Sequence, residues 1–170
     1  MAIFLSCEEV GHIISNATNG KPAPVLDMIK RVMLAYEMGN DDLHLKNLSL
    51  HRATADARYS YYDRLTPNYD VLFCDSFERP SQDSFLGLDL LANDDFTESY
   101  ERLGFYTLAD FIELGRRLQI PERAVKNFAS KLVALEDKAA ALIQSSYIPE
   151  VMRERVETVL RERLNVVSPG

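Results

Sequence analysis

The sequence predicts a mainly α-helical domain that contains one β-hairpin, and three observations support this fold class. Apolar residues recur at helical spacing before residue 39 and again from residue 95 to residue 165, which is typical of helices that bury one face. Between these regions, residues 48–64 are rich in tyrosine and alternate in the manner of strands. The length of 170 residues, 46% of them hydrophobic, suits one domain with a substantial core.

Two helices are expected before residue 40. Residues 6–17 should form the first, because Ser6 is a suitable N-cap and Glu9, three residues later, completes a capping box. After the turn TNGKPAP, residues 24–38 should form the second, which Gly39 ends. The apolar residues that share one face of this second helix are Val25, Leu26, Ile29, Val32, Met33 and Tyr36.

The middle of the chain is expected to be extended. Residues 48–53 and 58–64 should pair as a β-hairpin across the polar link TADA. The segment LTPNYDVLF that follows should be extended around Pro67, because the residue before a proline is disfavoured in the helical region. Residues 74–84 combine proline, serine and charged side chains, and they are expected to form a loop.

The remainder, residues 95–165, is expected to be a helical subdomain. Thr107 and Asp110 should cap one helix. Pro121 should occupy the first position of a second helix, which carries a single apolar stripe as far as Ile143, and Pro149 should open the last one. Residues 166–170 are expected to be a frayed tail after a single domain of residues 1–165.

The composition excludes several classes of protein. A net charge of −7 argues against direct binding of nucleic acid, since a phosphate backbone demands a basic face. The longest apolar runs are far shorter than a membrane span, and the first residues lack the basic lead of a signal peptide. Two cysteines without a CxxC pattern indicate reduced thiols. We therefore expect a cytoplasmic protein that does not contact membranes.

The stretch GNDDLHLKNLSL, residues 39–50, carries the candidate chemistry. Asp42 and Asn47 are five residues apart in a loop between a helix and a strand, which is the spacing of the catalytic loop of protein kinases. There the Asp accepts the proton of the attacking hydroxyl, and the Asn binds Mg²⁺. Asp70, a carboxylate with apolar neighbours that follows the expected hairpin, could supply a second metal ligand.

Two further residues of this loop are also candidates for a role in the site. His44 could hold the shape of the loop, and Lys46 could lie near the transferred phosphate. Each residue taken alone also has an ordinary interpretation. A D-x-x-x-x-N spacing is common in solvated loops, a single His is more often structural, and Asp70 could be a turn residue. The order of the groups and the intervening hairpin favour the functional interpretation.

The motifs GNDDLHLKNLSL and LTPNYDVLF together resemble the HipA-like serine/threonine kinases, whose best-known members are bacterial toxins. The catalytic loop of that family resembles G-N-x-D-x-H-x-K-N, and its metal-binding segment resembles L-x-P-x-Y-D-x-L. The segments DFIELGRRLQIPERAVKNFASKL and SSYIPEVMRERVETVLRERL are similar to its C-terminal helices, so the resemblance covers roughly residues 24 to 165. Residues 24–73 would hold the catalytic and metal-binding segments of a protein-kinase-like C-lobe.

The resemblance implies a cofactor, roles and partners. Mg²⁺ and ATP would bind at this lobe, with Asp42 as the base, Asn47 and Asp70 as metal ligands, and His44 and Lys46 at loop positions that the family also fills. Asp41 stands where the family has a small or neutral residue. The resemblance also implies a protein substrate and a DNA-binding antitoxin as partners.

About 40 residues precede the loop, and the seven glycines form no phosphate-binding motif. We therefore expect an N-lobe from another polypeptide or from a missing N-terminal part, docked on the apolar residues of 3–14. The chain would be inactive without it. The alternative is an inactive interaction module or decoy that binds an antitoxin or a kinase partner. Met1 is compatible with a native start and with a fragment boundary.

Overall fold

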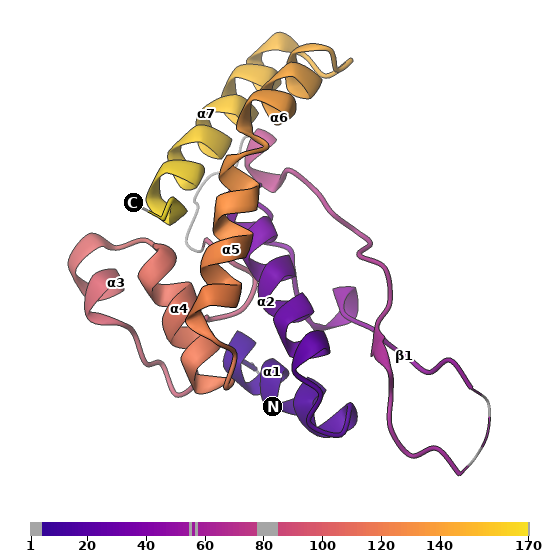
Figure 1. Ribbon diagram of the computed structural model, residues 1–170. Helices are drawn as coiled ribbons and strands as arrows, with labels where there is room; N and C mark the ends of the chain where they lie inside the picture. Colours follow the sequence, from indigo (N-terminus) through magenta and orange to yellow (C-terminus); the bar gives the residue numbers. More distant parts are fainter. Residues whose placement is uncertain (1–4, 55, 57, 78–84, 170) are drawn as a thin grey trace.

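The computed structural model describes residues 5–54, 56, 58–77 and 85–169, and it is mainly α-helical (Figure 1). Helices α1 (Cys7–Ala17) and α2 (Pro22–Glu37) come first. Two short strands, β1 (Leu50–His51) and β2 (Arg64–Leu65), form an antiparallel pair. The helices that follow are α3 (Glu98–Leu103), α4 (Leu108–Arg117), α5 (Glu122–Val133), α6 (Glu136–Gln144) and α7 (Glu150–Val167). The predicted mainly α fold with one hairpin is confirmed.

The two predicted N-terminal helices are confirmed together with their caps. The Ser6 hydroxyl accepts a hydrogen bond from the Glu9 N–H at 3.1 Å, and the Glu9 carboxylate accepts one from the Ser6 N–H at 2.8 Å. Thr107 and Asp110 form a capping box at the start of α4, where the Asp110 carboxylate accepts the Thr107 N–H at 2.6 Å and the Thr107 hydroxyl at 2.7 Å. A capping box satisfies two of the amide groups that a helix start leaves unpaired, so both helices begin where their sequences indicate.

Helix α2 is the central element of the core. It packs against α1, α4, α5 and α7, and Figure 1 shows α5 running alongside it. At its C-terminal end the Tyr36 ring lies 5.6 Å from the ring of Phe111 and 5.8 Å from that of Tyr106, and the Tyr36 hydroxyl donates to the Tyr106 carbonyl at 2.7 Å. The loop that follows α2 therefore starts from a closely packed part of the core.

The hairpin is shorter than the predicted one, and its second strand is displaced. The register pairs Leu50 with Leu65 and His51 with Arg64, so the predicted strand 58–64 contributes only its last residue. Leu65 is buried and packs on α2, whereas Tyr59 is 58% exposed. Because no layer covers the tyrosine-rich segment, its alternation does not produce a buried face that would extend the pairing.

The long helix expected from Pro121 to Ile143 is divided into α5 and α6. The Leu135 N–H bonds to the Leu132 carbonyl at 3.0 Å, a tighter turn that interrupts the helix. The apolar stripe of α5 would next require residue 136, which is Glu136. The two halves consequently pack differently: α5 packs against α2, α4 and α7, whereas α6 packs against α7.

The structure also differs from the sequence prediction in three smaller features. The predicted tail 166–170 begins too early, because α7 continues to Val167, a fully buried residue. Asp70, expected in an extended segment, has φ +56 and so lies in the left-handed region. Cys74–Ser76 forms a 3₁₀ turn at the start of the predicted loop 74–84, and the rest of that loop from residue 78 lies outside the described residues.

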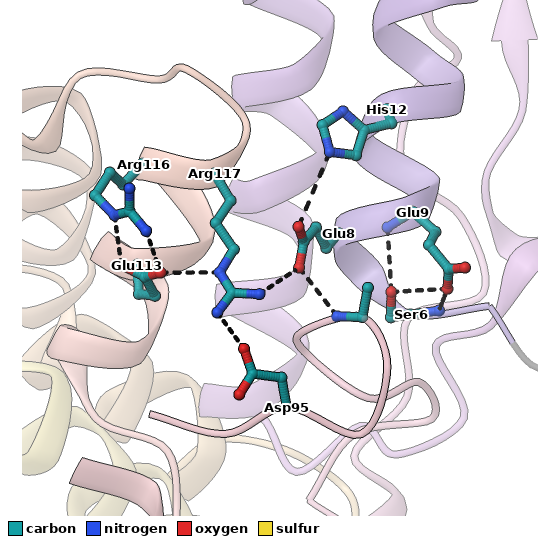
Figure 2. A network of polar contacts seen from close by, with 9 residues as sticks. Ser6, Glu8, Glu9, His12, Asp95, Glu113, Arg116 and Arg117 are labelled. Atoms are coloured by element: carbon teal, nitrogen blue, oxygen red, sulfur yellow. Dashed lines mark hydrogen bonds and ion pairs between the residues drawn. The ribbon is translucent and has the colours of Figure 1, made fainter. Parts of the chain in front are cut away.

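A network of charged side chains joins α1 to α4 (Figure 2). Arg117 donates to Glu113 at 2.8 Å, to Glu8 at 3.1 Å and to Asp95. Glu8 also accepts the Ala92 N–H at 3.0 Å, which holds the loop before α3 against α1. The guanidinium groups of Arg116 and Arg117 lower the pKa of Glu113 to about 2. Because these ion pairs are partly exposed, we expect each to add little to stability, but together they link α1, α4 and the loop before α3.

Within the described part of the chain, none of the helices combines the length and the apolar character needed to cross a membrane.

Candidate active site

The candidate loop begins where α2 ends, and Gly39 sets that boundary. The Asn40 N–H bonds back to the Ala35 carbonyl at 2.8 Å, and the Gly39 N–H bonds to the Tyr36 carbonyl at 3.1 Å. These two bonds are the Schellman pattern, which requires a left-handed residue at its end, and Gly39 has φ +63. A β-carbon there would also overlap the Asp75 carboxylate. Glycine is needed at this position both for its backbone conformation and for space.

Asn40 is a positioning residue to which the sequence pattern assigns no role. Its side chain is buried, and its Oδ1 accepts the Asp42 N–H at 3.2 Å and the Cys74 thiol at 3.3 Å. The first bond shapes the turn at residues 41–42, and the second ties this turn to the segment after Asp70. The signal was available in the sequence, since an Asn directly after a helix-ending Gly is a frequent turn former.

The structure brings together three of the five predicted site residues. Asn47 is 2% exposed at the end of a 3₁₀ turn, Leu45–Asn47. Its Oδ1 accepts the His44 N–H at 3.0 Å and contacts the His44 ring, while its Nδ2 donates to Asp70 Oδ2 at 2.7 Å. The hydrogen bond from Asn47 to Asp70 joins residues that are 23 positions apart in the sequence. It therefore links the loop of residues 39–50 to the segment of Asp70.

The other two predicted residues, Asp42 and Lys46, have exposed side chains on the same loop. Their backbones are fixed: Asn40 accepts the Asp42 N–H, and the Lys46 carbonyl accepts a hydrogen bond from the Tyr69 hydroxyl at 2.7 Å. Tyr69 immediately precedes Asp70, so this bond holds the two motifs together a second time. The exposure of Asp42 leaves its carboxylate accessible to a substrate hydroxyl.

Two further contacts hold the candidate loop and the segment of Asp70 in place. Arg31, buried in α2, donates to the Thr66 carbonyl and to Asp27, the latter at 2.9 Å. On the other side, a β-carbon at Gly87 would lie 2.5 Å from the Leu43 carbonyl oxygen and 2.6 Å from that of Asp41. The backbone of residue 87 therefore packs directly on the loop, and any larger residue would displace it.

Asn47 and Asp70 fit a divalent cation, with one rearrangement. A carboxylate and a carboxamide oxygen suit Mg²⁺, which keeps several waters and takes few protein ligands. In the present arrangement, however, the amide nitrogen of Asn47 faces Asp70, so its oxygen would reach the same cation only after the side chain turns. No cluster of three or more His, Cys, Asp or Glu residues that could hold a metal occurs among the described residues. Water or phosphate oxygens would therefore complete the shell.

Comparison with known proteins decides the family. The family model described as "HipA-like C-terminal domain" matches residues 2–140. The chain belongs to this family. As a HipA-like C-terminal domain, it carries both motifs within the match, whereas α7 lies beyond it.

A curated relative extends the likeness over almost the whole chain. The protein named "Putative kinase" from Haemophilus influenzae is 22% identical over 171 residues, which cover 97% of this chain and 48% of the relative. The HipA-like chain therefore spans about half the length of that relative.

Proposed function

We propose that the chain is the C-terminal catalytic lobe of a HipA-like protein serine/threonine kinase, which transfers the γ-phosphoryl group of Mg·ATP to a protein hydroxyl. The observation that carries the proposal is the hydrogen bond between Asn47 and Asp70, because it places the two expected metal-binding side chains side by side at the loop that holds Asp42. Phosphoryl transfer depends mostly on positioning and on neutralisation of charge. A rigid loop that gathers these groups is suited to it.

Each residue has a defined task in this proposal. Asp42 accepts the proton of the substrate hydroxyl, and its turn is held by Asn40. Asn47 and Asp70 would hold Mg²⁺, which supplies charge neutralisation at the phosphates when it is bound. His44 fixes Asn47 through its backbone N–H and its ring. Lys46 is exposed on the same loop and would lie near the transferred phosphate.

The proposal requires an N-lobe, from another polypeptide or from a longer form of this chain, to cover the nucleotide. The exposed apolar face expected at residues 3–14 is largely buried in the part that the structure describes. Cys7, Val10 and Ile14 are buried in the core, and Ile13 is exposed. Other apolar side chains, on the candidate loop and on the segment around and after Asp70, are exposed. We propose that the N-lobe docks on these residues: Leu45, Val71, Leu72 and Phe77. The antitoxin partner and the toxin role implied by the family stay predictions.

Binding of Mg·ATP, measured by calorimetry, tests the metal site. We expect saturable binding by the chain, alone or with an N-lobe, and a loss of about tenfold or more in Asp70→Asn. Asp94→Asn is the matched control, since Asp94 is also exposed with a left-handed φ of +52 and lies in the loop before α3. Equal binding by the wild type and Asp70→Asn would remove the assigned role of Asp70.

Phosphoryl transfer in a reconstituted kinase tests the base. Asp42→Ala should abolish transfer and leave folding intact, because the side chain is exposed. Normal phosphorylation by this variant would refute the assignment. Absence of Mg·ATP binding and transfer in every complex would favour the interaction module or decoy.

A further inference from the structure

Helix α7, which lies beyond the family match, is linked through one buried arginine to residues that flank the candidate active site. Arg163 is 8% exposed, and its guanidinium makes two hydrogen bonds to different parts of the chain. One arm donates to the Tyr36 carbonyl at 2.5 Å, and the other donates to Asp75 Oδ2 at 2.6 Å. The group also lies over the Tyr36 and Phe85 rings, 5.1 Å and 5.6 Å from their centroids.

The two partners of Arg163 flank the two segments that make up the site. Tyr36 is in the last turn of α2, three residues before Gly39, where the catalytic loop begins. Asp75 is five residues after Asp70, and its N–H donates to the Gly39 carbonyl at 3.2 Å. Its carboxylate fills the space that the missing side chain of Gly39 leaves open. One planar guanidinium therefore spans the start of the catalytic loop and the end of the metal-binding segment.

Stability alone does not account for this arrangement. Burying a charged pair costs solvation, and apolar residues of similar volume often stabilise a core as well or better. The planar guanidinium of an arginine can form directional hydrogen bonds to a carbonyl and to a carboxylate at the same time. A pair of apolar residues cannot form such bonds.

We propose that Arg163 is a positioning residue that sets the catalytic loop and the segment of Asp70 at a fixed distance from each other, so that α7 is part of the framework of the active site. Its catalytic meaning rests on the proposed kinase function, but the positioning itself does not. An element outside the family match would then control how Asn47 and Asp70 meet.

Hydrogen exchange of backbone amides, measured on the chain without nucleotide, tests the proposal. In Arg163→Met the amides of Asn40, Asp42 and Asp75 should exchange about tenfold faster or more, because a charge-assisted bond is lost at each segment. The amides of α4 and α5 should change little. Arg163→Lys, which retains the charge without the fork, should give a smaller increase. Arg161→Met is the matched control, since Arg161 is two residues away on α7 and is exposed, with an ion pair to Glu157 at the surface.

A second variant separates positioning from simple compensation of charge. Arg163→Met with Asp75→Asn removes both buried charges, so a role limited to charge compensation predicts exchange at the wild-type rate. Positioning predicts that the three site amides still exchange fast while α4 and α5 are protected. Wild-type rates at these amides, or a uniform increase over the whole chain in Arg163→Lys, would overturn the inference. Failure of the kinase function would appear separately, as absence of Mg·ATP binding by the wild type.

Discussion

Glu37 allows a quantitative prediction about stability and pH. It lies at the end of α2 and is 1% exposed, and neither carboxylate oxygen has a hydrogen-bond partner among the residues that the structure describes. Burial raises the pKa of Glu37 from 4.5 to about 8, and the nearby Arg163 offsets only part of this effect. A carboxyl group held neutral in this way makes the folded state sensitive to pH.

The sign and size of the effect follow from the two pKa values. Below about pH 4.5 the carboxyl group is protonated in both the folded and the unfolded chain, so it contributes no pH dependence. Between pH 4.5 and 8 the unfolded chain loses the proton and the folded chain keeps it, and stability falls by about 1.4 kcal/mol per pH unit. The loss is then about 3 kcal/mol at pH 7 and on the order of 5 kcal/mol above pH 8.

Glu37→Gln removes this dependence, because its amide has a similar shape and no charge. Urea unfolding of the wild type and the variant from pH 4 to pH 9 would show nearly equal free energies of unfolding at pH 4 and a growing advantage of the variant as pH rises. Glu154→Gln, the same substitution at an exposed position on α7, is the matched control. A constant difference between the wild type and Glu37→Gln over this range would refute the reasoning.

Three further substitutions test the packing around the site and the helix caps, each by the free energy of unfolding. Gly39→Ala should cost about 2 kcal/mol or more, because it combines a left-handed φ of +63 with a collision against Asp75. Gly104→Ala, at φ +75 in open space, should cost only about 1 kcal/mol. Equal losses of stability would show that Asp75 moves aside at no cost in free energy. Phe111→Ala should cost roughly 3–5 kcal/mol because the ring is fully buried, and a loss below about 1 kcal/mol would mean that the core closes around the gap. Thr107→Ala should cost about 1 kcal/mol through the capping box of α4, and an unchanged stability would show that Asp110 caps the helix alone.

Features that depend on neighbours within a few residues were predictable from the sequence. The capping boxes at Ser6 and Thr107 need only a carboxylate three residues later, and the end of α2 needs only a glycine. The candidate loop was predictable for the same reason, because the spacing from Asp42 to Asn47 is local. The break between α5 and α6 was also visible in principle, since Glu136 interrupts the apolar stripe.

The hairpin shows where local pattern fails. Alternation over residues 58–64 predicted a strand, but a strand of that length needs a layer that buries one of its faces. Leu65 is buried against α2, whereas Tyr59, Tyr61 and Tyr62 are exposed, and pairing is confined to residues 64 and 65. Which segment of an alternating stretch forms a strand is decided by what packs on it.

By itself, the sequence determined the helical class, the positions of the caps and the identity of the residues in the two motifs. Only the tertiary structure placed Asn47 beside Asp70, connected Asn40 to Cys74, and brought Arg163 to Asp75. These pairs are separated by 23, 34 and 88 residues. A periodic pattern shows which face of a helix is buried, but it does not show which distant polar group lies opposite, because that depends on how all the helices pack around α2.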